Sequence, residues 1–135
     1  MTATIGLDIS PVAPVTFILD GRLPGMNEVI AANRSHRQKG ADLKRDTEDG
    51  VMWAMKAQRV KPVPSPVRVC IVWYEPSMRR DPDNIFSAVK FILDAMVKGG
   101  ILEGDSQRHI RAITHECALD RKRPRVEVTL WGVGA

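Results

Sequence analysis

Alternation of apolar and polar residues predicts the strands of this protein. In VTFILD (15–20), every second residue is apolar, which is the two-residue period of a half-buried strand. VRVCIVWY (67–74) carries apolar residues on both faces and is rich in β-branched and aromatic types, so it predicts a central strand. A return strand is expected over residues 109–117, and a last strand over RVEVTLW (125–131), where the alternation returns.

Apolar residues spaced for amphipathic helices separate these strands. One helix is expected from about residue 41 to residue 60, interrupted or softened near Gly50. A second helix is expected from Pro82 to Lys98, with its apolar side turned to the core. The resulting order, β-α-β-α-β-β, predicts an α/β or α+β fold with one mixed sheet and two main helices.

Length and charge narrow the class of protein. The chain has 135 residues, so we expect an N-terminal arm over residues 1–14 and a single domain over residues 15–135. It contains 20 Lys and Arg against 16 Asp and Glu, a formal net charge of +4 that favours a polyanionic partner. It has neither an apolar run of about 20 residues nor a basic and apolar leader. The expectation is a cytoplasmic protein without membrane contact.

The candidate chemistry is concentrated in RRDPDNIFSAVKFILDAM (79–96). On one continuous helix, four polar residues share a stripe roughly 60° wide, because successive residues lie about 100° apart. These residues are Asp83, Ser87, Lys90 and Asp94. Asp81 stands just before the helix, and Pro82 suits its first position, where a backbone N–H is not needed.

Each of these charges has two interpretations. In the structural one, Asp81 caps the helix, Asp83 faces its positive end, and Lys90 pairs with Asp94 one turn away. In the functional one, Asp81 and Asp83 hold a cation, because two carboxylates so close together otherwise repel. Mg²⁺ and Mn²⁺ accept oxygen ligands, and such an ion activates water and neutralises phosphate charge in phosphodiester hydrolysis.

A further candidate ligand lies in GGILEGDSQ (99–107). Asp105 stands in a turn before the next expected strand, and Glu103 is a rival two residues earlier. Spacing alone does not bring Asp105 beside Asp81. The residues by themselves therefore predict a carboxylate metal site on a basic domain and leave its third ligand open.

Several segments resemble the RusA-like family of Holliday junction resolvases, which phages and prophages often carry. They are RDPDN (80–84), LDAM (93–96), GGIL (99–102), GDSQ (104–107) and, at the family's opening segment, LPGMNE (23–28). The similarity spans residues 15–131, and residues 80–107 are its specific part. It implies a homodimeric endodeoxyribonuclease of DNA recombination and repair. Such an enzyme makes paired nicks in a four-way junction with Mg²⁺ or Mn²⁺ and needs no small-molecule cofactor.

The resemblance also implies roles for individual residues. It assigns the metal ion to Asp81, Asp83 and Asp105. Asn84 and Asp94 match family positions for which a supporting role is expected. Ser87 stands where other members have a lysine, and we expect Lys90 to take over this catalytic role from one turn further along the helix.

Contacts with DNA are expected mainly from the basic segment NRSHRQKGADLKR (33–45) and from arginines before the acidic motif. The expected residues are Arg34, Arg37, Lys39, Lys44, Arg45, Arg79 and Arg80. Such charges track phosphates without reading sequence, although an ordinary solvated face has the same composition. Two other functions stay open. One is a non-catalytic DNA-binding protein, and the other is a nuclease that cuts flaps or forks with the same acidic residues.

Overall fold

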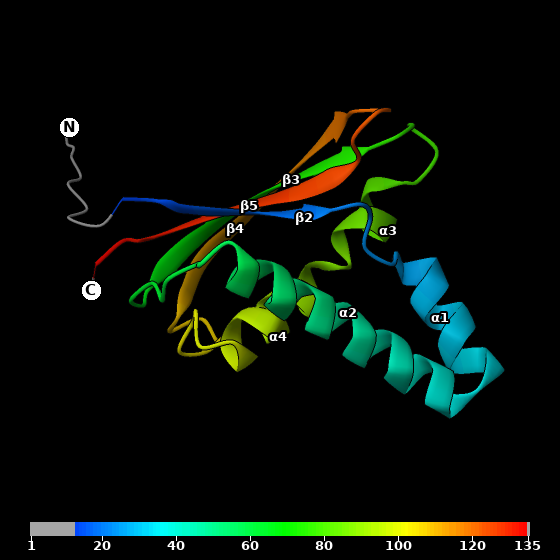
Figure 1. The fold of residues 1–135 in the computed structure, drawn as a ribbon, viewed down its shortest axis with the longest axis horizontal. Coiled ribbons are helices and arrows are strands. Elements are labelled where there is room, and N and C mark those ends of the chain that lie inside the picture. The colour runs from blue at the N-terminus through cyan, green and yellow to red at the C-terminus, as the bar shows by residue number, and fades with distance from the viewer. Residues whose placement is uncertain (1–12, 135) are drawn as a thin grey trace.

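One mixed sheet organises the part of the chain that the structure, a computed structural model, describes, namely residues 13–134 (Figure 1). Its strand order is β2 (Val15–Asp20), β5 (Arg125–Gly132), β3 (Val67–Glu75) and β4 (Ile110–Leu119). Strand β5 pairs antiparallel with both β2 and β3, whereas β3 and β4 are parallel. The expected mixed sheet is confirmed, with the segment 67–74 in a central strand. The arm expected over residues 1–14 lies outside the described residues except for residues 13 and 14.

Helices pack against one face of this sheet. They are α1 (Met26–Ser35), α2 (Arg37–Ala57), α3 (Pro82–Phe86) and α4 (Val89–Lys98). Alternate residues of β3 are buried beneath them, and the residues between are exposed or partly exposed on the other face. Figure 1 shows α2 and α4 beside the sheet, while α1 and the start of α2 extend beyond it as a hairpin. None of the helices within residues 13–134 has the length and apolar character that a membrane span requires.

The core lies between the sheet and helices α2 and α4. Its fully buried side chains include Phe17, Ile71 and Val128 from the strands and Ile92 and Met96 from α4. Burial of such side chains is the main stabilising term for a domain of this size. The buried side chains of α4 fix this helix on the sheet. The polar residues at its start and on its outer side are positioned by that packing.

The helices differ from the sequence expectation in three ways. The helix expected over residues 41–60 is α2, which begins at Arg37 and runs through Gly50 without interruption. Helix α1 was not expected, because it buries none of its residues fully and so carries little apolar signal. The helix expected over residues 82–98 is divided by a turn at Ser87 and Ala88.

Candidate functional site

A buried ion pair fixes the loop that leads into α3. The guanidinium of Arg80 donates from Nε and Nη2 to the two carboxylate oxygens of Glu75, at 3.0 and 2.7 Å. Glu75 ends β3 and is 6% exposed, and Arg22 lies 3.3 Å from its Oε1. Arg80 Nη1 also donates to the carbonyl of Leu23 at 3.2 Å. Arg80 was expected to contact DNA; in the structure its guanidinium is held by these internal bonds, and its side chain is 13% exposed.

Asn84 joins α3 to the beginning of α1. Its side-chain Oδ1 accepts the backbone N–H of Asn27 at 3.0 Å. Gly25 passes so close that a Cβ there would lie 2.6 Å from the same Oδ1, so a larger residue at this position would displace the Asn84 carboxamide. The segments 23–28 and 80–84, which carry two of the family-like motifs, therefore meet in space.

The two acids of the RDPDN motif lie at the exposed start of α3. Asp81 is the residue before the first turn, and its side chain makes no capping hydrogen bond. Asp83 accepts the backbone N–H of Asn84 at its Oδ1, 2.9 Å away. Both residues are exposed. Their remaining carboxylate oxygens are available to a ligand from solvent.

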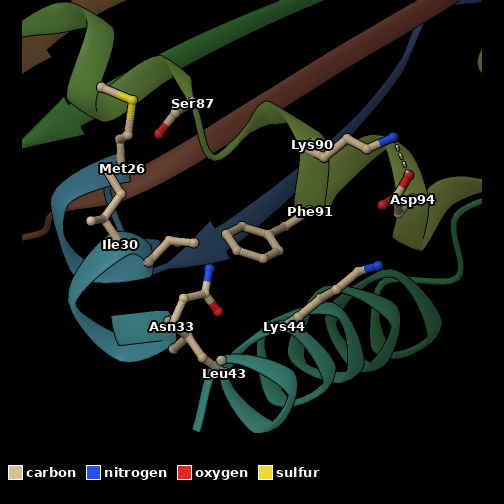
Figure 2. Close-up of a pocket in the computed structure, with 11 residues that line it drawn as sticks. Met26, Ile30, Asn33, Leu43, Lys44, Ser87, Lys90, Phe91 and Asp94 are labelled. Atoms are coloured by element: carbon tan, nitrogen blue, oxygen red, sulfur yellow. Dashed lines mark ion pairs between the residues drawn. The ribbon is translucent and has the colours of Figure 1, made fainter. Parts of the chain in front are cut away.

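Lys90 connects the third candidate acid to α4. Its Nζ lies 3.1 Å from Asp94 Oδ1 and 3.7 Å from Asp105 Oδ2. Figure 2 shows the ion pair with Asp94. The hydrogen bond to Asp94 raises the pKa of Lys90, and Asp105 adds to this effect, so the ammonium group stays charged at neutral pH. The side chain of Lys90 is 68% exposed, which keeps it accessible to a phosphate.

Asp105 is directed toward Lys90 by a closed loop. Ser106 Oγ and His109 Nδ1 are 2.9 Å apart, and a Cβ at Gly104 would lie 2.7 Å from the His109 ring. Glycine at 104 therefore allows the loop to close over this histidine. The rival ligand Glu103 is exposed and forms none of the ion pairs found within residues 13–134.

The structure does not gather all the expected ligands. Within residues 13–134, no group of three or more Asp, Glu, His or Cys side chains is close enough together to hold a metal ion. Asp105 meets Lys90 and Asp94, whereas Asp81 and Asp83 lie on the other side of the turn at residues 87–88. Of the polar stripe expected on a continuous helix, Ser87, Lys90 and Asp94 still line one groove, whereas Asp83, before the turn, is not part of that lining.

The expected DNA-contacting residues of segment 33–45 lie on the projecting α1–α2 hairpin. All of them are exposed: Arg34, Arg37, Lys39, Lys44 and Arg45. Arg45 pairs with Asp42 at 2.7 Å and approaches Asp46 at 3.8 Å, so part of its charge is neutralised. Gln38 and Arg45 both bond to Asp42 and lower its pKa. Arg79 is exposed in the loop before α3 and is available to a phosphate.

Two features were missed by the sequence reasoning. The first is Glu48 of α2, which is 1% exposed and pairs through Oε1 with Lys98 at the end of α4. Its hydrogen bond raises the pKa of Lys98, and its Oε2 is buried without a hydrogen-bond partner in the described part of the chain. A charged residue within an exposed-looking helix gives no sequence signal of such burial.

The second feature is a groove of about 370 Å³ between α1, α2 and α4 (Figure 2). Five of its lining residues are apolar: Met26, Val29, Ile30, Leu43 and Phe91. Lys44 and Lys90 stand at its rim, and Asn33 and Ser87 add polar atoms. The groove forms only where α1 packs beside α2 and α4. Its lining residues come from separate segments, so no periodic pattern in the sequence predicts it.

Comparison with known proteins does not assign this site. No protein-family model matches the sequence, and no curated protein is significantly similar to it. The RusA-like character therefore remains an expectation that rests on the quoted segments. The function has to be inferred from those residues and their geometry.

Proposed function

We propose that this protein is a Mg²⁺- or Mn²⁺-dependent endodeoxyribonuclease that cuts branched DNA, with the four-way junction as its preferred substrate. The observation that carries the proposal is the contact of Lys90 with Asp105, 3.7 Å apart, which joins the GDSQ turn to the helix following the RDPDN motif. A protonated lysine beside carboxylates suits phosphodiester hydrolysis, because the ammonium group and a metal ion can both stabilise the negative charge on the phosphate oxygens.

The donor chemistry fits a hard divalent cation, although the three acids do not form one cluster. Asp81, Asp83 and Asp105 offer carboxylate oxygens, which Mg²⁺ prefers, and all three residues are exposed. The resemblance assigns the ion to these residues, and holding it would require the Asp105 turn and the start of α3 to come closer together than they lie in this structure. When bound, it would supply an activated water and neutralise charge on the phosphate.

The other residues of the site act through position and charge. Lys90 stays protonated and can donate hydrogen bonds to a phosphate oxygen. Asp94, 3.1 Å away, holds that ammonium on the outer side of α4. Asn84 keeps α3 against α1 through its bond to Asn27. This bond holds the two acids at the start of α3 in position.

Phosphate contacts away from the cut would come from exposed basic residues. These are Arg34, Arg37, Lys39, Lys44, Arg45 and Arg79. Such contacts give salt-sensitive binding that tolerates any sequence. Paired symmetric nicks also need two active sites, and one 15.0 kDa chain supplies one. A two-fold homodimer is therefore part of the proposal, and light scattering should give about twice the chain mass.

The test is cleavage of a labelled four-way junction with Mg²⁺, Mn²⁺, Ca²⁺ or a chelator. Mg²⁺ and Mn²⁺ should support nicking, whereas Ca²⁺ should permit binding with little cleavage, because its looser coordination misplaces water. Asp83→Asn should abolish nicking, lose Mn²⁺ binding measured by electron paramagnetic resonance, and keep junction binding. Asp49→Asn, which alters an exposed acid of α2, is the matched control. Near wild-type cleavage by Asp83→Asn would show that the site is assigned wrongly.

A non-catalytic DNA-binding protein is the second candidate. It is favoured by the lack of a three-carboxylate cluster within residues 13–134 and by the pairing of Lys90 with two acids. Such a protein would bind the junction in a salt-dependent manner and leave it intact in every metal. Faster cutting of flaps or forks than of junctions would instead identify a nuclease for other branched DNA.

A further inference from the structure

We propose that the groove beside Lys90 binds one unstacked nucleobase of the DNA substrate. The inference rests on the proposed function and adds a binding site to it. The groove has a volume of about 370 Å³, within the range of about 300–1,000 Å³ typical of small-molecule sites. It opens between the α1–α2 hairpin and α4, with Lys90 among its lining residues (Figure 2). Lys90 Nζ also lies 3.7 Å from Asp105 Oδ2.

The lining suits the flat, apolar faces of a base. Met26 and Ile30 are 38% and 39% exposed, although residues of their type are usually covered. Figure 2 shows them on α1, across the groove from the ring of Phe91 on α4. Stacking of a base on an aromatic ring is tolerant of sequence, because every base has such a face.

Polar groups on two walls suit the edge of a base. Ser87 Oγ donates to the carbonyl of Asn84 at 2.8 Å, which leaves its oxygen free to accept a hydrogen bond. The carboxamide of Asn33 lies over Gly40, where a Cβ would be 1.7 Å from its Oδ1. In Figure 2 this carboxamide lies beside the groove, below Ile30 and Phe91. Amide and hydroxyl groups of this kind pair with the donors and acceptors of base edges.

The charge at the rim selects a nucleotide over an uncharged apolar occupant. Lys44 and Lys90 are both exposed and line the groove from α2 and α4. The one acid in the lining, Asp94, is already paired with Lys90. An apolar floor beneath two ammonium groups complements a base whose flanking phosphates lie outside. An apolar peptide or lipid chain would make no contact that uses the charge of either lysine.

A base that enters this groove is more easily supplied by branched DNA than by a duplex. A base inside a duplex must be unpaired and unstacked before it can enter a pocket, whereas a base at a branch point costs less to extrude. Since Lys90 is shared with Asp105, a base held here would lie near the phosphate at the proposed site. The groove would therefore favour branched DNA without reading its sequence.

The experiment places single abasic nucleotides at each position around the branch of a four-way junction and measures affinity by fluorescence anisotropy in Ca²⁺. With the wild-type protein, one abasic position should weaken binding about tenfold relative to the intact junction. Ile30→Trp fills the groove and should bind the intact junction about tenfold more weakly, with no further loss at that abasic position. Leu119→Trp, which enlarges an exposed apolar residue of β4 outside the groove, should behave as the wild type.

The outcomes separate this inference from the proposed function. A wild-type protein that binds and nicks the junction but responds equally to every abasic position overturns the base-binding groove and leaves the nuclease intact. A protein that neither binds nor nicks any branched DNA overturns the proposed function itself. Loss of the dimer mass in Ile30→Trp would assign the groove to a second copy of the chain and also overturn the inference. If Ile30→Trp does not fold, Met26→Trp replaces it, and the wild-type abasic series still decides.

Discussion

Two adjacent arginines, Arg79 and Arg80, should respond to alanine substitution in opposite ways. The side chain of Arg80 is 13% exposed and makes two hydrogen bonds to Glu75, whose side chain is 7% exposed. Removing one partner of a buried pair costs about 3–5 kcal/mol, because the other charge remains buried. Arg22 still lies 3.3 Å from Glu75 and compensates in part, so we expect Arg80→Ala to cost about 3 kcal/mol.

Arg79 provides the matched control because it is exposed and lies one residue earlier. Arg79→Ala should change the free energy of unfolding by less than about 0.5 kcal/mol. It should instead weaken junction binding and lower the salt slope of log K by about 1, as loss of one phosphate contact does. Arg80→Ala should lower Tm by roughly 10 °C and leave the salt slope unchanged.

Urea unfolding followed by circular dichroism measures the first effect, and anisotropy titrations at several salt concentrations measure the second. Glu75→Gln combined with Arg80→Ala should be more stable than Arg80→Ala alone, because the uncompensated buried charge is removed. A loss below about 1 kcal/mol in Arg80→Ala, or a salt slope reduced as much as in Arg79→Ala, would refute the structural role of Arg80.

Three further predictions concern catalysis, pH and packing. Lys90→Ala should slow nicking at saturating junction at least about tenfold, or 1.4 kcal/mol of barrier, with Tm little changed; a wild-type rate would leave Lys90 only its pairing with Asp94. Burial lowers the pKa of His115, so the unfolded chain binds the proton more readily. Stability should therefore be complete above about pH 6.5 and fall below it, and His115→Phe should flatten this slope in urea titrations. Gly25→Ala should cost about 1 kcal/mol by displacing Asn84, whereas Gly50→Ala, in open space within α2, should stabilise by up to about 1 kcal/mol; equal effects would contradict both assignments.

Strands β2, β3 and β5 could be predicted closely because their burial follows a two-residue period. The segment VTFILD has the bounds of β2, and the segment 67–74 falls one residue short of β3. Helix α1 could not be predicted in this way. It is held by Glu28, which accepts the N–H of Gly25 at 3.1 Å, and by Asn84 from a distant segment, and neither contact produces a periodic pattern.

The candidate residues of the site could be named from the sequence, but their arrangement could not. Asp105 could not be placed beside α4 from its spacing, because the closed loop at Ser106 and His109 determines where it points. The groove likewise depends on how α1 packs. The sequence alone could identify the charged residues, because they stand between the apolar positions that form the core.

The division of the expected helix has a physical cause that also decides what Lys90 contacts. Ile85, Ala88 and Phe91 are all buried and stand three residues apart. The N–H of Ala88 bonds to the carbonyl of Ile85 at 3.3 Å, and that of Phe91 to the carbonyl of Ala88 at 3.0 Å. A turn of three residues keeps such positions in line, whereas 3.6 residues per turn would rotate Phe91 away from the core.

The tighter turn rotates each residue by about 120° instead of about 100°, so every position after it is shifted around the axis. Lys90 follows the turn and lines the groove together with Ser87 and Asp94, whereas Asp83 does not. Lys90 reaches Asp94 and Asp105. Burial of three apolar residues thus favours the tighter turn between Asp83 and Lys90, and Lys90 pairs with two acids that follow it in the chain. For this reason the proposed catalytic role joins Lys90 to Asp105 rather than to Asp83.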